Sequence, residues 1–144
     1  MLKTEYGADS FLNGLNCAQA VFSSFSKDYG LDTIMACKIA GGLGSGARVA
    51  ELCGAVSGAV LVIGLKYGPK TTADVDLKQK CNSETKEFMR RFRAANGNIV
   101  CRNLLSCNIA TKEGRETAVT KDLFKTKCKD LVVSAIGILT DMGY

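Results

Sequence analysis

The chain has 144 residues, a formal net charge of +5 and no histidine. One domain, residues 1–144, is the default for this length, and such a chain can bury a core without disulfide bonds. The lack of histidine excludes Ser-His and Cys-His catalysis, imidazole zinc ligands and an axial histidine for haem. Any chemistry must therefore come from cysteines, carboxylates, lysines, tyrosines or a bound cofactor.

Helical periodicity and capping residues predict an all-α protein. Asn16 and Asp32 are suitable N-caps, and Gly30 and Gly97 are suitable C-terminal stops. No segment shows the sustained alternation of a β-strand. The expected helices are 2–13, 16–29, 32–40, 47–66, 71–96 and 127–142, with one helical turn after Asn98 and a polar segment at 111–125. We expect a compact bundle of five or six helices around the buried, Gly/Ala-rich helix at 47–66.

The central stretch 41–68 contains eight of the fifteen glycines. Ala50, Gly54 and Gly58 recur four apart, so on a helix they share one face and allow a neighbouring backbone to approach closely. Gly42, Gly44 and Ala47 match the pattern G-x-G-x-x-A, but a dinucleotide site needs a preceding strand, which the sequence lacks.

Seven cysteines are many for a domain of this size. The N-terminus has no apolar signal region and the longest uncharged apolar run is too short to span a bilayer, so we expect the reducing cytoplasm. There, cysteines indicate metal binding or redox work rather than a disulfide framework. The basic groups at 86–93 and 121–129 are typical of solvated helix faces, and without tryptophan or aromatic-basic alternation we expect no nucleic-acid binding.

Three cysteines lie at predicted helix N-termini, where the helix dipole and free N–H groups favour the thiolate. Cys17 directly follows the cap Asn16, Cys101 lies three residues after the expected cap Asn98, and Cys128 opens the last helix. Cys53 lies in the glycine-rich helix. Because no C-x-x-C pair occurs, any site that these four share must be assembled from separate helices.

The other three cysteines have weaker assignments. Free cysteine is among the most buried residue types, so packing is the default role for each. Cys81 lies in the apolar stripe of a long helix and Cys37 beside Ile34 on a short one, which predicts core positions. Cys107 lies in a turn-like segment, and its role stays open.

Four short elements resemble a known family, the redox-active proteins with the signature C_GCAxxG_C_C. They are Asn16–Val21 (NCAQAV), Cys53–Gly58 (CGAVSG), Val100–Leu105 (VCRNLL) and Thr126–Lys129 (TKCK). Their order along the chain is that of the family, although the signature has Gly-Cys-Ala where this chain has Cys-Gly-Ala. The resemblance covers about residues 5–140 and places Cys17, Cys53, Cys101 and Cys128 on the four signature cysteines.

The resemblance implies a bacterial or archaeal redox protein, with an oxidoreductase or transporter component as its partner. Three functions stay open. The four cysteines could bind zinc or an iron–sulfur cluster for electron transfer, since an all-thiolate site needs no histidine. Two of them could instead cycle as a thiol–disulfide pair. The third alternative is a non-catalytic helical adaptor whose cysteines are structural.

Overall fold

The computed structural model describes residues 1–144 and confirms an all-α protein without strands. Its α-helices are α1 (Lys3–Leu12), α2 (Cys17–Ser26), α3 (Thr33–Ile39), α4 (Gly54–Tyr67), α5 (Val75–Asn96), α6 (Cys101–Leu105), α7 (Lys112–Thr120) and α8 (Lys129–Asp141). The expected five or six helices become eight, because α6 and α7 are short and carry little apolar periodicity. A 3-10 turn, Lys27–Tyr29, extends α2, and a π-helical turn, Phe124–Cys128, leads into α8.

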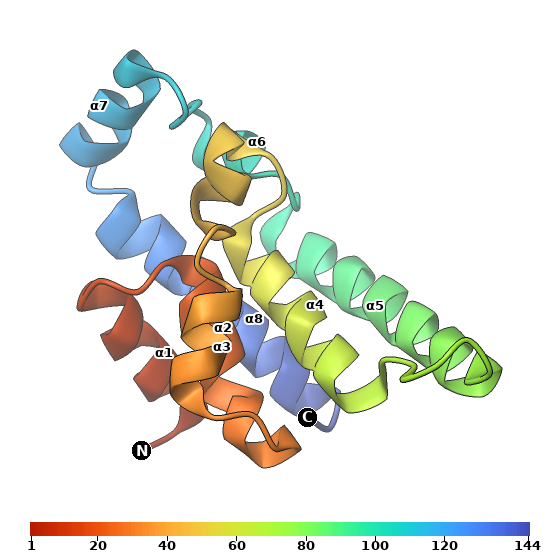
Figure 1. Ribbon diagram of the computed structural model, residues 1–144. Coiled ribbons are helices and arrows are strands. Elements are labelled where there is room, and N and C mark those ends of the chain that lie inside the picture. The colour runs from red at the N-terminus through yellow and green to blue at the C-terminus, as the bar shows by residue number, and fades with distance from the viewer.

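Two neighbouring helices share the middle of the fold. α2 packs against α1, α3, α4 and α8, whereas α4 packs against α2, α5 and α8. α6 and α7 lie at the end of the molecule away from the two chain termini (Figure 1). The expectation of one central helix is therefore not confirmed. The largest fully buried side chains come from four helices: Phe25, Ile63, Phe88, Phe92, Ile136 and Leu139.

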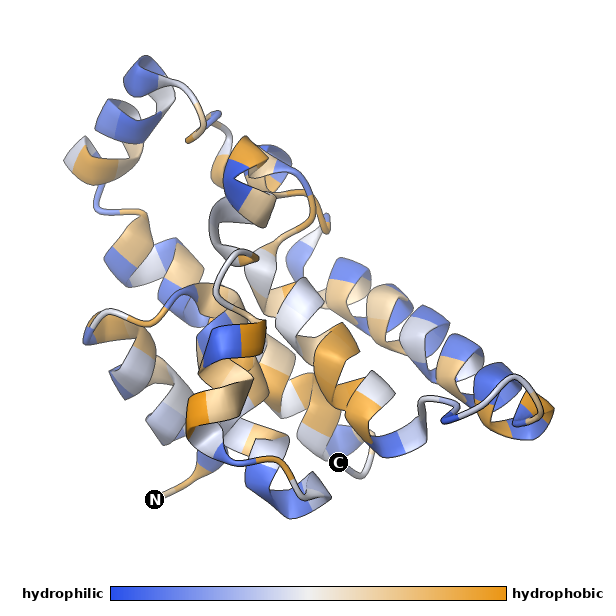
Figure 2. Ribbon diagram, viewed as in Figure 1, coloured by the Kyte–Doolittle hydropathy of each residue, from blue (hydrophilic) through white to orange (hydrophobic).

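Hydropathy follows this arrangement. α4 is apolar over most of its length, whereas α5 alternates between polar and apolar residues along its course (Figure 2). On α5 only Phe88 and Phe92 are fully buried, and they stack on each other. None of the helices combines the length and the apolar character needed to cross a membrane.

The helix ends that the sequence predicts are largely confirmed. Asn16 Oδ1 accepts a hydrogen bond from the Gln19 backbone N–H at 2.8 Å, and Gln19 Oε1 accepts from the Asn16 N–H in return, which makes a capping box. At the start of α3, Asp32 Oδ1 accepts a hydrogen bond from the Met35 backbone N–H at 2.9 Å. Gly30 and Gly97 adopt left-handed φ angles of 83° and 89° at helix ends, as a C-terminal glycine commonly does.

The beginning of α4 differs from the prediction. The segment before α4 has left-handed φ angles, between 54° and 69°, at Ser45, Ala47, Arg48 and Ala50. α4 begins only at Gly54. Left-handed backbone costs an L-residue about 1–2 kcal/mol. No local signal predicts such a turn in non-glycine residues. As a result, Cys53 precedes α4 rather than lying within it, and Ala50 lies outside the helix.

The close approach predicted for Gly54 and Gly58 is confirmed. A Cβ at Gly58 would lie 2.6 Å from Ala18 O and 3.0 Å from Val21 Cβ. A Cβ at Gly54 would overlap Cys17 Sγ. α4 can therefore reach α2 only because these two positions carry no side chain.

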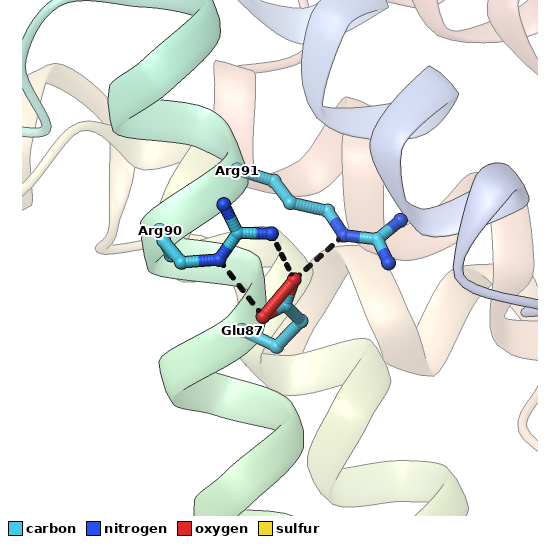
Figure 3. A network of polar contacts seen from close by, with 3 residues as sticks. All are labelled: Glu87, Arg90 and Arg91. Atoms are coloured by element: carbon cyan, nitrogen blue, oxygen red, sulfur yellow. Dashed lines mark hydrogen bonds and ion pairs between the residues drawn. The ribbon is translucent and has the colours of Figure 1, made fainter.

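The basic group at 86–93 lies on α5. Arg90 and Arg91 each donate from Nε to the carboxylate of Glu87 at 3.0 Å (Figure 3). These bonds hold the pKa of the Glu87 carboxyl at about 2. Two of the arginines in this group are thus paired on their own helix.

We expect Gly58→Ala to destabilise the fold by about 1–3 kcal/mol, because its new methyl group meets backbone atoms of α2 that cannot move away cheaply. Gly64→Ala in the same helix is the matched control. A Cβ at Gly64 has no neighbour within 4 Å, so this substitution should stabilise α4 by about 0.5–1 kcal/mol. Urea unfolding measures both, and equal effects of the two substitutions would contradict the close approach.

Candidate functional site

Cys17, Cys53, Cys101 and Cys128 all line one cavity of about 110 Å³. It lies where the beginnings of α2, α4 and α6 meet the turn before α8. Its remaining wall is mostly apolar: Phe11, Leu104, Leu105, Ile109, Phe124 and Leu131. The fold thus gathers at one place the four cysteines that the sequence singles out.

The start of α2 fixes Cys17. Cys17 is the first residue of the helix and follows the cap Asn16. Asn16 Nδ2 also donates to Ala40 O at 3.2 Å and to Gly41 O at 3.1 Å, which ties this helix end to the end of α3. The sulfur of Cys17 then lies against Gly54, the residue after Cys53, in the space that a side chain would fill.

A single antiparallel bridge fixes Cys53 and Cys101 relative to each other. Leu52 pairs with Val100. Cys53 N–H donates to Ile99 O at 2.8 Å, and Cys101 N–H donates to Glu51 O at 2.6 Å. In such a pair the two cysteines lie on one face as diagonal neighbours, which are typically about 7–8 Å apart.

Arg102 reinforces this bridge from outside. Its Nη1 donates to Ala50 O at 3.1 Å and forms an ion pair with Glu51 Oε1 at 2.7 Å. The carbonyl at the end of the left-handed turn is therefore held by α6. Both charged side chains keep contact with solvent, so their role here is to position the backbone around Cys53.

The prediction of helix N-termini is correct for Cys17 and Cys101 and wrong for Cys128. Cys17 and Cys101 are the first residues of α2 and α6. Cys128 ends the π-helical turn that runs directly into α8, and its N–H already donates to Leu123 O at 2.9 Å. Because helical structure continues through Cys128, no free helix end faces its sulfur.

Burial overrides the expected tendency to form thiolates. It raises the pKa of Cys53 to about 12 and that of Cys101 to about 11, and it also raises the pKa of Cys17 and Cys128. Backbone N–H groups of Ser45, Ala18 and Gly54 act in the opposite direction on the pKa of Cys17, but the loss of hydration outweighs them. The prediction of thiolates is thus wrong for the metal-free protein.

The four thiols also oppose each other's ionisation. A charge on Cys17 raises the pKa of Cys53, Cys101 and Cys128, and charges on Cys53 and Cys101 raise the pKa of Cys128 further. Arg102 is the cation that lowers the pKa of Cys101. The cavity therefore brings several soft donors together without enough positive charge to ionise them.

Three residues around the cavity are assigned no role from the sequence. The contacts of Arg102 with Ala50 and Glu51 depend on the Leu52–Val100 bridge. Arg115 reaches the cavity from α7 and places its guanidinium 5.2 Å from the centre of the Phe124 ring. Arg115 and Phe124 belong to segments that the sequence describes only as polar, so their approach depends on the path of the chain between α6 and α8.

The remaining cysteines lie outside the cavity lining. Cys81 is half-buried and packs against the main core, in partial agreement with the prediction. Cys37 is half-buried on α3 and packs against neither the main core nor a second, smaller cluster of buried apolar residues, so its core assignment is wrong. Cys107 packs against the smaller apolar cluster, which contains Cys101.

The donor chemistry of the cavity fits a soft metal ion or an iron–sulfur cluster, because four thiolates and no histidine are a familiar ligand set for both. The sulfurs are not drawn together: no three potential ligands lie close enough to hold a metal ion, and all seven cysteines are free thiols. Binding would thus require the cysteines to move inward.

The family model described as "Putative redox-active protein (C_GCAxxG_C_C)" matches residues 15–142 of the chain. The match spans all four cavity cysteines. No curated protein and no solved structure matches the chain.

The raised thiol pKa values predict a stability that falls with pH in the metal-free protein. Above about pH 8.5, the ordinary thiol pKa, the unfolded chain loses protons that the folded state keeps, so unfolding becomes more favourable. Each such group contributes up to about 1.4 kcal/mol per pH unit until its folded pKa is reached. Urea unfolding between pH 7.5 and 10 should show this slope, and Cys53→Ala should reduce it. A pH-independent stability would contradict the burial of these thiols.

Proposed function

The chain belongs to this family of redox-active proteins, and from that premise we propose that Cys17, Cys53, Cys101 and Cys128 bind an iron–sulfur cluster or zinc. With a cluster bound, the protein serves in electron transfer to a partner oxidoreductase. The observation that carries the proposal is that four cysteines from four separate parts of the chain line one cavity.

The electrostatics of the cavity support metal ligation over free-thiol chemistry. Both need thiolates, but burial and mutual repulsion hold the free thiols in the protonated form. A bound cation supplies the missing positive charge, so the cysteines can release their protons as they ligate it. A free thiol in the same place has no such compensation and is a poor nucleophile at neutral pH.

The other residues of the cavity would limit what reaches the site. Phe11, Leu104 and Leu131 form an apolar wall beside the four cysteines. Ser45 and Gly54 present backbone N–H groups to Cys17. An iron–sulfur cluster held there would supply reversible one-electron chemistry, with a potential set by such hydrogen bonds and by burial.

Anaerobic purification, followed by reconstitution with iron and sulfide, tests the proposal. We expect visible absorption, bound iron and the loss of four titratable thiols on the same sample, because four cysteines become ligands. If zinc is the native metal, metal analysis of the purified protein should show it without visible colour. A colourless protein that binds neither iron nor zinc would overturn the proposal.

Cys53→Ser and Cys81→Ser form a matched pair for this test. Cys53 lines the cavity, whereas Cys81 packs against the main core outside it. We expect Cys53→Ser to lose metal and absorption and Cys81→Ser to retain both. Equal retention in the two variants would show that the metal is bound elsewhere.

A second candidate is a reversible disulfide between Cys17 and Cys53. It is favoured by the contact of Cys17 Sγ with Gly54, directly after Cys53. A charge on Cys17 also raises the pKa of Cys53, after the larger effect of burial. Two half-reactions would balance: the cysteines lose two protons and two electrons, which a disulfide substrate accepts. The pair would have to move together to form the bond.

For this candidate, the free-thiol count should change by two, reversibly, between mild oxidant and reductant. Cys17→Ser and Cys53→Ser should each abolish the change, because either removes one partner of the bond. An unchanged count in the wild type would exclude the pair. If metal binding also fails, the adaptor function with structural cysteines is the one that remains.

A further inference from the structure

We propose that Cys107 is a fifth redox-active thiol, which forms a disulfide with Cys101 when the metal-free protein meets a small-molecule disulfide. The family signature contains only four cysteines, and none of its elements includes Cys107. Its position beside the site gives it a role that the signature does not describe.

Three cysteines meet in the smaller apolar cluster of the protein. Cys101 is one of its buried members, together with Ala50, Leu105, Ile109 and Ala118. Cys107 and Cys128 pack against this cluster from its edge. Cys107 therefore lies on the α6 side of the cavity, beside the buried cluster that contains Cys101.

The short helix α6 brings Cys107 back towards Cys101. α6 spans only Cys101–Leu105 and ends at Ser106, which has a left-handed φ of 56°. A left-handed residue at a helix end turns the chain, so that the next residue commonly packs back on the preceding turn. Because few residues separate the two cysteines, closing the loop between them costs little entropy.

The loop after Cys107 is fixed to α7, which holds Cys107 in place. Asn108 O accepts hydrogen bonds from Thr111 N–H at 3.1 Å and from Thr111 Oγ1 at 2.8 Å. Gly114 lies so close to Asn108 O that a side chain at Gly114 would overlap it. Cys107 itself is half-buried, so a small molecule can reach it more readily than the buried Cys101.

The chemistry is a two-step thiol–disulfide exchange. Cys107 gives up its proton to solvent and attacks one sulfur of a disulfide such as oxidised glutathione, which forms a mixed disulfide and releases one thiol. Cys101 then loses its proton and attacks the Cys107 sulfur, which forms the Cys101–Cys107 bond and releases the second thiol. The protein loses two electrons and two protons, and the small disulfide gains them.

The consequence for the cavity depends on the proposed function. With Cys101 in a disulfide, only three of the four proposed ligands remain. The oxidised protein should therefore fail to load metal until a reductant restores Cys101. The disulfide itself does not depend on metal binding, so the two proposals fail separately.

Peptide mapping of the metal-free protein tests the disulfide. After treatment with oxidised glutathione, trypsin cleaves at Arg93, Arg102 and Lys112 and separates Cys101 from Cys107. We expect the peptides 94–102 and 103–112 to be joined in the non-reduced digest and to separate on reduction. Cys81→Ser, the control, should give the same joined peptides.

Two variants define the order of the steps. In Cys101→Ser, glutathione should stay on peptide 103–112, because the second thiol is missing. In Cys107→Ser, no disulfide should involve peptide 94–102. The proposal is overturned if Cys107 stays a free thiol in the wild type, if wild-type Cys107 retains glutathione, or if Cys101 pairs with Cys128 instead.

Discussion

The contact between Gly54 and Cys17 is the constraint on which the arrangement of the cavity depends. The first turn of α4 lies against the first turn of α2, and the sulfur of Cys17 occupies the space that a side chain at Gly54 would take. This contact sets the distance between two helix beginnings that each carry a cysteine. The Leu52–Val100 bridge then brings Cys101 to the same place, and the π-helical turn before α8 adds Cys128.

The cavity combines two opposing effects. Apolar walls and close packing exclude water, which stabilises the core but makes charge on the sulfurs costly. Backbone N–H groups at the helix beginnings face Cys17 and Cys53, yet they are too few to offset the lost hydration. The metal-free protein therefore holds four neutral thiols. These thiols would have to lose their protons to bind a metal ion.

Sequence reasoning succeeded where local rules decide the structure. The caps at Asn16 and Asp32 and the glycine stop at Gly97 depend on neighbouring residues alone, and all are present. The grouping of the four cysteines was predicted from their places on separate helices and from the family resemblance, because no spacing along the chain indicates it. The predicted charge state of the cysteines was wrong, because the pKa of a thiol depends on burial, which the whole fold determines.

The prediction of where α4 starts was wrong for a different reason. The left-handed segment Ser45–Arg48 contains one glycine, and its other residues carry no preference for that conformation. A left-handed turn of L-residues is the mirror image of one turn of an ordinary helix. D-residues would adopt it without steric conflict, so beside its cysteines the chain is locally folded with the opposite chirality. What this segment contributes is thus the direction of its backbone N–H and C=O groups, more than the identity of its side chains.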